Sequence, residues 1–221
     1  MNRVALYYTH DAKPEWFTLR IYDRLREQTR RLGIRLVTVT RRGRPDADAE
    51  VAFAGEGKPE LDMYGRIIAG LGACEKDDSV FFCEDDVLYA DRRFAPIGEV
   101  DPDAIYYHLN FVLLTDRGFT ENGYDREVLA LSQARGRADY LLKCMKWKVQ
   151  EIEEHRFDCF EPANGGPFPY KSFGITSPHS CIDIRFQNHT EKDLSDAVMF
   201  FQESGWPDSH EMSRLWVTEK P

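Results

Sequence analysis

The first forty residues place one amphipathic stretch between two short apolar runs, and this order restricts the fold more than any other feature. Residues 3–8 and 34–39 are apolar and rich in residues that favour strands. Between them, residues 16–32 repeat apolar side chains at helical spacing, namely Phe17, Ile21, Leu25 and Leu32. Gly33 follows, at a position suited to end a helix. Strand, helix and strand in this length predict a βαβ unit with two parallel strands.

The same alternation continues after a polar stretch, residues 41–57, which contains Gly and Pro and predicts a loop. An apolar stripe then predicts a second helix, which begins after Pro59 and contains Leu61, Tyr64, Ile67, Ile68 and Leu71. Residues 79–83 are apolar and bounded by charges, as in a buried central strand. These units predict an α/β fold with a mostly parallel sheet flanked by helices.

The patterns in the rest of the chain are weaker. We expect strands at residues 105–107, 109–114 and 180–186. We expect a mainly helical segment at residues 124–150, a loop at 161–171 and a helix at 194–204. The length of 221 residues, with 42% hydrophobic residues, suits a single domain over residues 1–221.

Composition also bounds the setting in which the chain works. No run approaches about 18 apolar residues, so no membrane span is expected. The five cysteines show no Cys-x-x-Cys spacing, which favours a reducing compartment, the cytoplasm, over a disulfide or zinc framework. The net charge of −9 argues against a general nucleic-acid coat. We predict no obligate protein partner.

Three consecutive carboxylates, Glu84, Asp85 and Asp86, follow the predicted central strand, and apolar residues resume at once. Adjacent like charges are costly unless a positive charge lies among them. Ligands of open α/β sheets bind at the carboxyl ends of strands, and hard oxygen ligands suit Mg²⁺ or Mn²⁺. The triplet therefore predicts a metal site, and the alternative is a charged turn between two strands.

The order of these elements, with a helix over residues 64–71 and a strand that ends in Glu84-Asp85-Asp86-Val87, resembles the GT-A glycosyltransferases. In that family the acidic signature is the DxD motif. The resemblance covers about residues 3–115, a nucleotide-sugar-binding half. It leaves about residues 116–221 as an acceptor-side half with a C-terminal metal and phosphate segment.

The resemblance implies a GT-A fold and a glycosyltransferase that uses a nucleotide-diphosphate sugar, with UDP-glucose as the leading donor. Asp86 would ligate Mn²⁺ or Mg²⁺, which would neutralise the departing nucleoside diphosphate. Glu84 and Asp85 would face the ribose and the sugar. Asp85 and Asp183 are the candidate catalytic carboxylates, although Asp125 and Asp139 are further candidates for the base.

The resemblance also suggests residues outside the acidic triplet. Residues 177–189 look like a segment of small bacteriophage glycosyltransferases, so His179 or His189 would add a metal ligand and Arg185 would hold a phosphate. Either histidine could instead lie at the surface or at a strand end.

Two more positions would contact the nucleotide. Tyr8 would stack on the base and Thr9 would pair with its edge, or both belong to an ordinary strand-to-helix turn. Arg66 would contact the pyrophosphate, or it pairs with Asp62 one helical turn away on the surface.

The acceptor is suggested by basic residues that occur with aromatic ones: Arg41, Arg42, Arg44, Arg135, Arg137, Lys143, Lys146 and Lys148, with Tyr140 and Trp147. This combination is typical of a nucleic-acid groove and equally of a helix with one solvated face. The leading hypothesis is a hydroxymethylated pyrimidine in phage DNA, which would place the enzyme in the host cytoplasm. A glycan or small-molecule acceptor is the alternative.

Two other classes of function compete with this interpretation. A nucleotidyltransferase would share the α/β start and the acidic site, but the loop Thr9–Pro14 lacks the glycines that would hold a triphosphate. A non-catalytic interaction domain would make the acidic triplet a surface accident.

Overall fold

The computed structural model describes residues 2–9, 13–44, 46–55, 59–96, 101–109, 111–115, 118–121, 129–154, 169–175 and 181–185. It confirms the βαβ unit at the start of the chain. Strand β1 (Arg3–Tyr8) leads into helix α1 (Glu15–Leu32), and strand β2 (Arg35–Thr40) pairs with β1 in parallel. Gly33 ends α1 with a φ of 62°, and its N–H donates to the Arg30 carbonyl. This left-handed backbone is the reason a glycine stands there.

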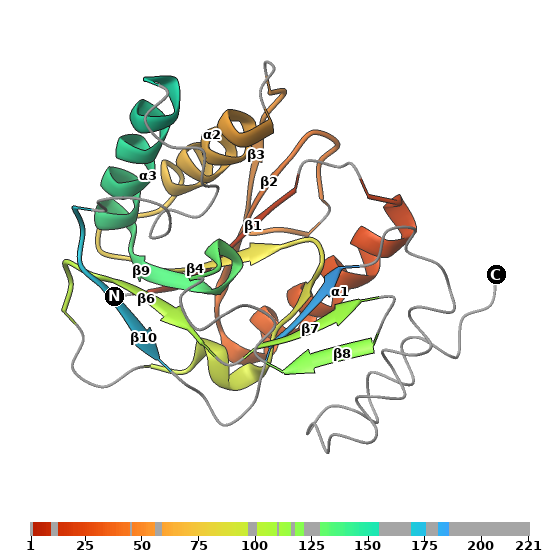
Figure 1. Ribbon diagram of the computed structural model, residues 1–221. Helices are drawn as coiled ribbons and strands as arrows, with labels where there is room; N and C mark the ends of the chain where they lie inside the picture. The colour runs from red at the N-terminus through yellow and green to blue at the C-terminus, as the bar shows by residue number, and fades with distance from the viewer. Residues whose placement is uncertain are drawn as a thin grey trace.

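The main sheet has seven strands in the order β10-β6-β9-β4-β1-β2-β3 (Figure 1). Beside β1 and β2 these are β3 (Ala49–Ala52), β4 (Ser79–Glu84), β6 (Ile105–His108), β9 (Ala134–Arg137) and β10 (Ser172–Ile175). Only β9 runs antiparallel to its neighbours, β4 and β6. The predicted α/β fold with a mostly parallel sheet is confirmed.

A second, four-stranded sheet has the order β5-β11-β7-β8. It consists of β5 (Val87–Leu88), β7 (Phe111–Thr115), β8 (Gly118–Glu121) and β11 (Cys181–Arg185). Strand β5 begins directly after the acidic triplet. This sheet therefore ties the triplet to residues that lie nearly a hundred positions later in the chain.

Helices cover both faces of the main sheet, as Figure 1 shows. Helices α2 (Pro59–Leu71) and α3 (Ala138–Glu153) lie against each other on one face, where they enclose alternate residues of β1 and β4 such as Leu6 and Phe82. The intervening residues, such as Tyr7 and Phe81, pack with α1 on the other face. Gly70 lets α2 approach the sheet, because a Cβ there would collide with Leu6 and Val39.

A fully buried arginine, Arg93, joins the centre of the sheet to the two single-turn 3₁₀ helices η1 (Asp91–Phe94) and η2 (Leu131–Gln133). Its guanidinium donates to the Phe82 and Ser132 carbonyls at 2.9 and 2.8 Å, to the Gln133 and Ala134 carbonyls at 3.0 and 3.3 Å, and to the Gln133 side-chain oxygen at 3.2 Å. It also lies 4.9 Å from the centre of the Tyr89 ring. Carbonyl dipoles thus solvate this charge.

Two predicted elements differ from the structure. Residues 41–57, expected as a loop, contain the edge strand β3, and residues 134–137, expected as helix, form β9. Strand β3 is half-exposed and pairs on one side only, so its sequence lacks a clear apolar run. Strand β9 is held between two neighbours that are distant in sequence, and this pairing outweighs local helical preference.

Other expectations fall partly beyond the described residues. The strands expected at 105–107, 109–114 and 180–186 correspond to β6, β7 and β11. The helix expected at 194–204 and most of the loop at 161–171 lie outside the described residues. Within the described part, none of the helices is both long and apolar enough to cross a membrane.

Candidate functional site

The acidic triplet lies at the carboxyl end of β4, next to the carboxyl end of β1. The two strands are parallel neighbours, and their register sets Tyr8 beside Glu84. The Tyr8 hydroxyl donates to Glu84 Oε1 at 2.7 Å, and the Thr9 hydroxyl donates to Asp85 Oδ2. The structure therefore brings together four residues that sequence analysis had assigned to one site from separate segments.

A lysine bridges the two aspartates. Lys13 Nζ lies 2.7 Å from Asp85 Oδ1 and 2.6 Å from Asp86 Oδ2. Both carboxylate side chains are only 3% exposed, and the Lys13 side chain is 17% exposed. Desolvation acts to lower the pKa of Lys13, but the charges of Asp86 and Asp85 outweigh it and raise that pKa above its usual value. The ammonium stays charged and compensates the repulsion between the adjacent carboxylates.

Sequence analysis missed Lys13. It lies between β1 and α1, and the adjacency of β1 and β4 places it beside the acids. Parallel strands present their carboxyl ends at the same edge of a sheet, so a base after one strand and acids after its neighbour can be placed together once the strand order is known.

The main chain of the acidic turn is held from two sides. The Glu84 N–H donates to the Tyr89 hydroxyl at 2.8 Å. The Ile184 N–H donates to the Asp86 carbonyl at 2.8 Å, which joins the turn to β11. Burial raises the pKa of Tyr89 well above its usual value, and the nearby Cys83 adds to this shift. The Tyr89 hydroxyl therefore keeps its proton.

The other candidate site residues are distributed as follows. Asp183 lies on β11 opposite Val87 and is fully buried. Arg185 is the last residue of β11, one position beyond the residue bonded to Asp86. His179 and His189 lie outside the described residues. Their predicted roles stay predictions.

Tyr8 and Arg66 are both enclosed by the fold. The Tyr8 ring is 4% exposed and meets Phe82 edge-on, with 6.1 Å between the ring centres. Arg66 on α2 is 1% exposed, and its guanidinium carbon lies 5.2 Å from the centre of the Phe53 ring. Because Arg66 is buried, the alternative of an exposed surface pair between Arg66 and Asp62 is wrong.

Of the other candidate bases, Asp139 lies at the opposite end of the strands. Its neighbour Arg137 pairs with Ser79, the first residue of β4, so a six-residue strand of about 16 Å separates it from the triplet. Hydrogen bonds from Arg137 lower the pKa of Asp139. Asp125 lies outside the described residues.

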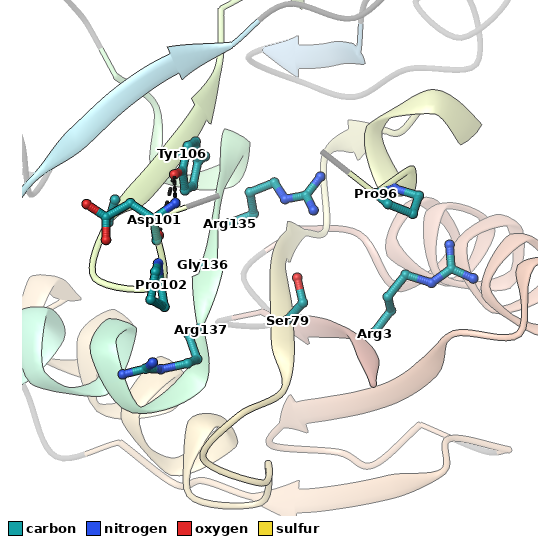
Figure 2. Close-up of a pocket in the computed structure, with 10 residues that line it drawn as sticks. Arg3, Ser79, Pro96, Asp101, Pro102, Tyr106, Arg135, Gly136 and Arg137 are labelled. Atoms are coloured by element: carbon teal, nitrogen blue, oxygen red, sulfur yellow. Dashed lines mark hydrogen bonds between the residues drawn. The ribbon is translucent and has the colours of Figure 1, made fainter. Parts of the chain in front are cut away.

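A cavity of about 290 Å³ also opens at that far end, as Figure 2 shows. Arg3 and Ser79, the first residues of β1 and β4, line it together with Arg135, Arg137 and Tyr106. Because the acidic triplet begins with Glu84, the last residue of β4, this cavity at the start of β4 is not part of the candidate site.

The basic residues proposed for DNA binding differ in exposure: Arg137 is half-buried and pairs with Asp103 and Asp139, and the other seven form two groups. Arg44, Arg135 and Lys148 are at most 5% exposed, and the Arg135 guanidinium lies 4.3 Å from the centre of the Phe81 ring. These three side chains present little charge to solvent, so that part of the prediction was wrong. Arg41, Arg42, Lys143 and Lys146 are exposed.

The donor atoms of the acidic turn suit a hard cation. Asp85 and Asp86 offer carboxylate oxygens, the ligands that Mg²⁺ and Mn²⁺ prefer. Among the described residues, no three His, Cys, Asp or Glu side chains converge to hold a metal ion. The two aspartates would therefore supply only part of a coordination shell, and Lys13 holds one oxygen of each.

These features define the class of fold. A mostly parallel seven-stranded sheet with one antiparallel strand beside β4, and helices on both faces, is an α/β fold of the GT-A type. The acidic turn lies at the end of a central strand of that sheet.

Comparison with solved structures agrees on the fold. A glycosyltransferase involved in the glycosylation of the major capsid of PBCV-1 superposes with a TM-score of 0.56 and 12% identity, over 89% of this chain and 100% of that chain. A protein from Desulfovibrio desulfuricans G20, assigned as a nucleotide-diphospho-sugar transferase, has a TM-score of 0.47 and 10% identity over 97% of this chain and 95% of its own. No protein-family model and no curated protein matches the chain. At 12% identity, the first likeness shows the fold alone.

Proposed function

We propose that this protein is a glycosyltransferase that moves a sugar from a nucleotide-diphosphate sugar, with UDP-glucose as the leading donor, to an acceptor hydroxyl. The observation that carries the proposal is the acidic turn at the carboxyl end of β4, held against the carboxyl end of β1 in a GT-A fold. In open α/β sheets, this edge is where ligands bind.

Asp86 would ligate Mn²⁺ or Mg²⁺ in this proposal, with His179 or His189 as a further ligand and Arg185 on a phosphate. When bound, the cation would neutralise negative charge on the nucleoside diphosphate that leaves. The remaining steps belong to the chain. Tyr8 and Thr9 fix the orientation of the Glu84 and Asp85 carboxylates through hydrogen bonds.

The reaction forms a bond between the acceptor oxygen and the anomeric carbon, and it breaks the bond between that carbon and the diphosphate oxygen. The acceptor proton passes to a carboxylate, for which Asp85 and Asp183 are the candidates. Asp85 is held by Thr9 and Lys13, and Asp183 is fully buried on β11. Because both carboxylates are enclosed by the protein, we expect the bound donor to complete the surroundings of whichever carboxylate accepts the proton.

For the acceptor we propose a hydroxymethylated pyrimidine in phage DNA. Its support is the group of exposed bases that the structure leaves at the surface: Arg41, Arg42, Lys143 and Lys146. A glycan or small-molecule acceptor is the alternative, and salt dependence separates the two because only DNA releases counterions on binding.

Thermal unfolding with UDP-glucose, with Mn²⁺ or with EDTA, tests the donor. A ligand at 100 times its Kd stabilises the native state by about 2.7 kcal/mol, which is measurable. We expect stabilisation only with Mn²⁺, none for Asp86→Asn, and the wild-type response for the matched control Asp77→Asn, whose side chain is exposed. Release of UDP, measured by chromatography, then reports turnover.

Two results would overturn the proposal. One is the absence of any stabilisation by UDP-sugars in either buffer. The other is an Asp86→Asn variant that binds and turns over UDP-glucose as the wild type does.

A further inference from the structure

The position of Lys13 affects how any other cation could bind at the acidic turn. The inference drawn from it depends on the proposed function only for the identity of that cation. The ammonium bonds one oxygen of Asp85 and one of Asp86, at 2.7 and 2.6 Å. A single positive group that bridges oxygens of two different carboxylates occupies the place that a metal ion would take between them.

The bridge is well enclosed on the acid side. Asp85 is 2% exposed and Asp86 is 2% exposed as whole residues, and the second oxygen of Asp85 accepts the Thr9 hydroxyl. A divalent cation placed between these two oxygens would lie against the ammonium and be repelled by it. Lysine and a bridging divalent cation therefore compete for the same space.

The Lys13 side chain is not fully enclosed. Its side chain retains 17% exposure, so one side of it faces solvent. The ammonium sits on a flexible four-carbon chain, unlike the planar guanidinium of arginine. Rotation of this chain would move the charge into water and open the space between the aspartates.

We propose that Lys13 is the resident cation of the acidic turn, and that Mn²⁺ or Mg²⁺ binds there only by displacing its ammonium. Lys13 then sets the cation affinity of the site. It keeps the carboxylates paired when no metal is bound, and it makes the empty protein bind metal weakly. A donor diphosphate, which adds oxygen ligands, would favour the exchange.

The test measures Mn²⁺ binding directly, by calorimetry and by the electron paramagnetic resonance signal of free Mn²⁺, with no nucleotide present. The variant is Lys13→Met, and the matched control is Lys76→Met, which removes an exposed lysine. Groups adjacent to metal ligands commonly change metal affinity by about 10–100-fold. We expect Lys13→Met to bind Mn²⁺ tighter by about this factor, and Lys76→Met to bind like the wild type.

Removal of Lys13 leaves two buried carboxylates without this cation, so the variant could unfold more easily. Two further measurements keep the proposal testable in that case. Mn²⁺ should raise the unfolding temperature of Lys13→Met more than that of the wild type. Lys13→Arg keeps a positive charge and should bind Mn²⁺ no tighter than the wild type.

Equal or weaker Mn²⁺ binding by Lys13→Met would overturn the proposal, as would a failure of both proteins to bind Mn²⁺ at millimolar concentration. UDP-glucose turnover in EDTA is measured in parallel to separate the two hypotheses. Turnover in EDTA would leave the glycosyltransferase in place and overturn its metal dependence, and cation exchange is then judged by Mn²⁺ binding alone. Tighter Mn²⁺ binding by Lys13→Met than by the wild type, without UDP-sugar binding, would support cation exchange and overturn the glycosyltransferase.

Discussion

Replacement of Arg93 by methionine should destabilise the protein by about 4 kcal/mol. The variant removes the donor from five oxygen acceptors that surround a fully buried guanidinium. A buried acceptor left without a donor costs about 1–3 kcal/mol. If only two of these acceptors find no other donor, the loss is already about 2–6 kcal/mol. Methionine fills similar space but cannot satisfy carbonyl dipoles that converge on it.

Urea unfolding followed by circular dichroism measures this loss. With a slope of about 2 kcal/mol per molar urea, 4 kcal/mol lowers the midpoint by about 2 M. The adjacent Arg92 is exposed and provides the matched control, Arg92→Met, which should shift the midpoint little. Equal midpoints for the two variants would refute the argument that carbonyl groups solvate Arg93 and depend on it.

Three further predictions concern other parts of the molecule. Burial, with the charges of Arg93 and Arg135, lowers the pKa of His108 to about 2, so only the unfolded chain binds a proton on this histidine as the pH falls below about 6.5. The free energy of unfolding should therefore fall by up to about 1.4 kcal/mol for each pH unit below 6.5, and urea titrations at pH 7 and pH 5 should show that His108→Gln removes this contribution. Burial raises the pKa of the Cys83 thiol to about 12, so peptide mapping should find iodoacetamide on Cys83 only after unfolding, and rapid labelling of the native protein would contradict this. If the four exposed bases each contact a DNA phosphate, the log–log salt slope of binding should be about −3 to −4, whereas a flat dependence would favour a neutral acceptor.

The central part of the fold was predictable because it consists of continuous apolar runs. Strands β1, β2 and β4 are buried in the middle of the sheet, and their sequences carry that burial directly. Edge strand β3 was missed because it is half-exposed and lacks an apolar run, and antiparallel strand β9 was missed because its pairing depends on distant partners. The amino-acid pattern of Ala134–Arg137 contains no information about β6, to which it binds.

The candidate site was predictable to a similar degree. The acidic triplet ends β4 as expected, because the charges interrupt an apolar run. Lys13 could be assigned only once β1 and β4 were known to be neighbours. The burial of Arg135 and Lys148 was not readable either, since a basic residue in an amphipathic pattern is ordinarily assigned to the solvated face.

The bond between the Ile184 N–H and the Asp86 carbonyl also bears on how the protein is made. A ribosome releases the acidic turn long before it releases β11, and domains tend to fold from the N-terminus as synthesis proceeds. The early strands can pair while the later half is still being translated, but the turn acquires its second anchor only when residue 184 has emerged. The acidic turn is therefore complete only after β11 has been synthesised, and nascent chains that stop short of β11 would carry a paired β1, β2 and β4 with a turn that lacks this anchor.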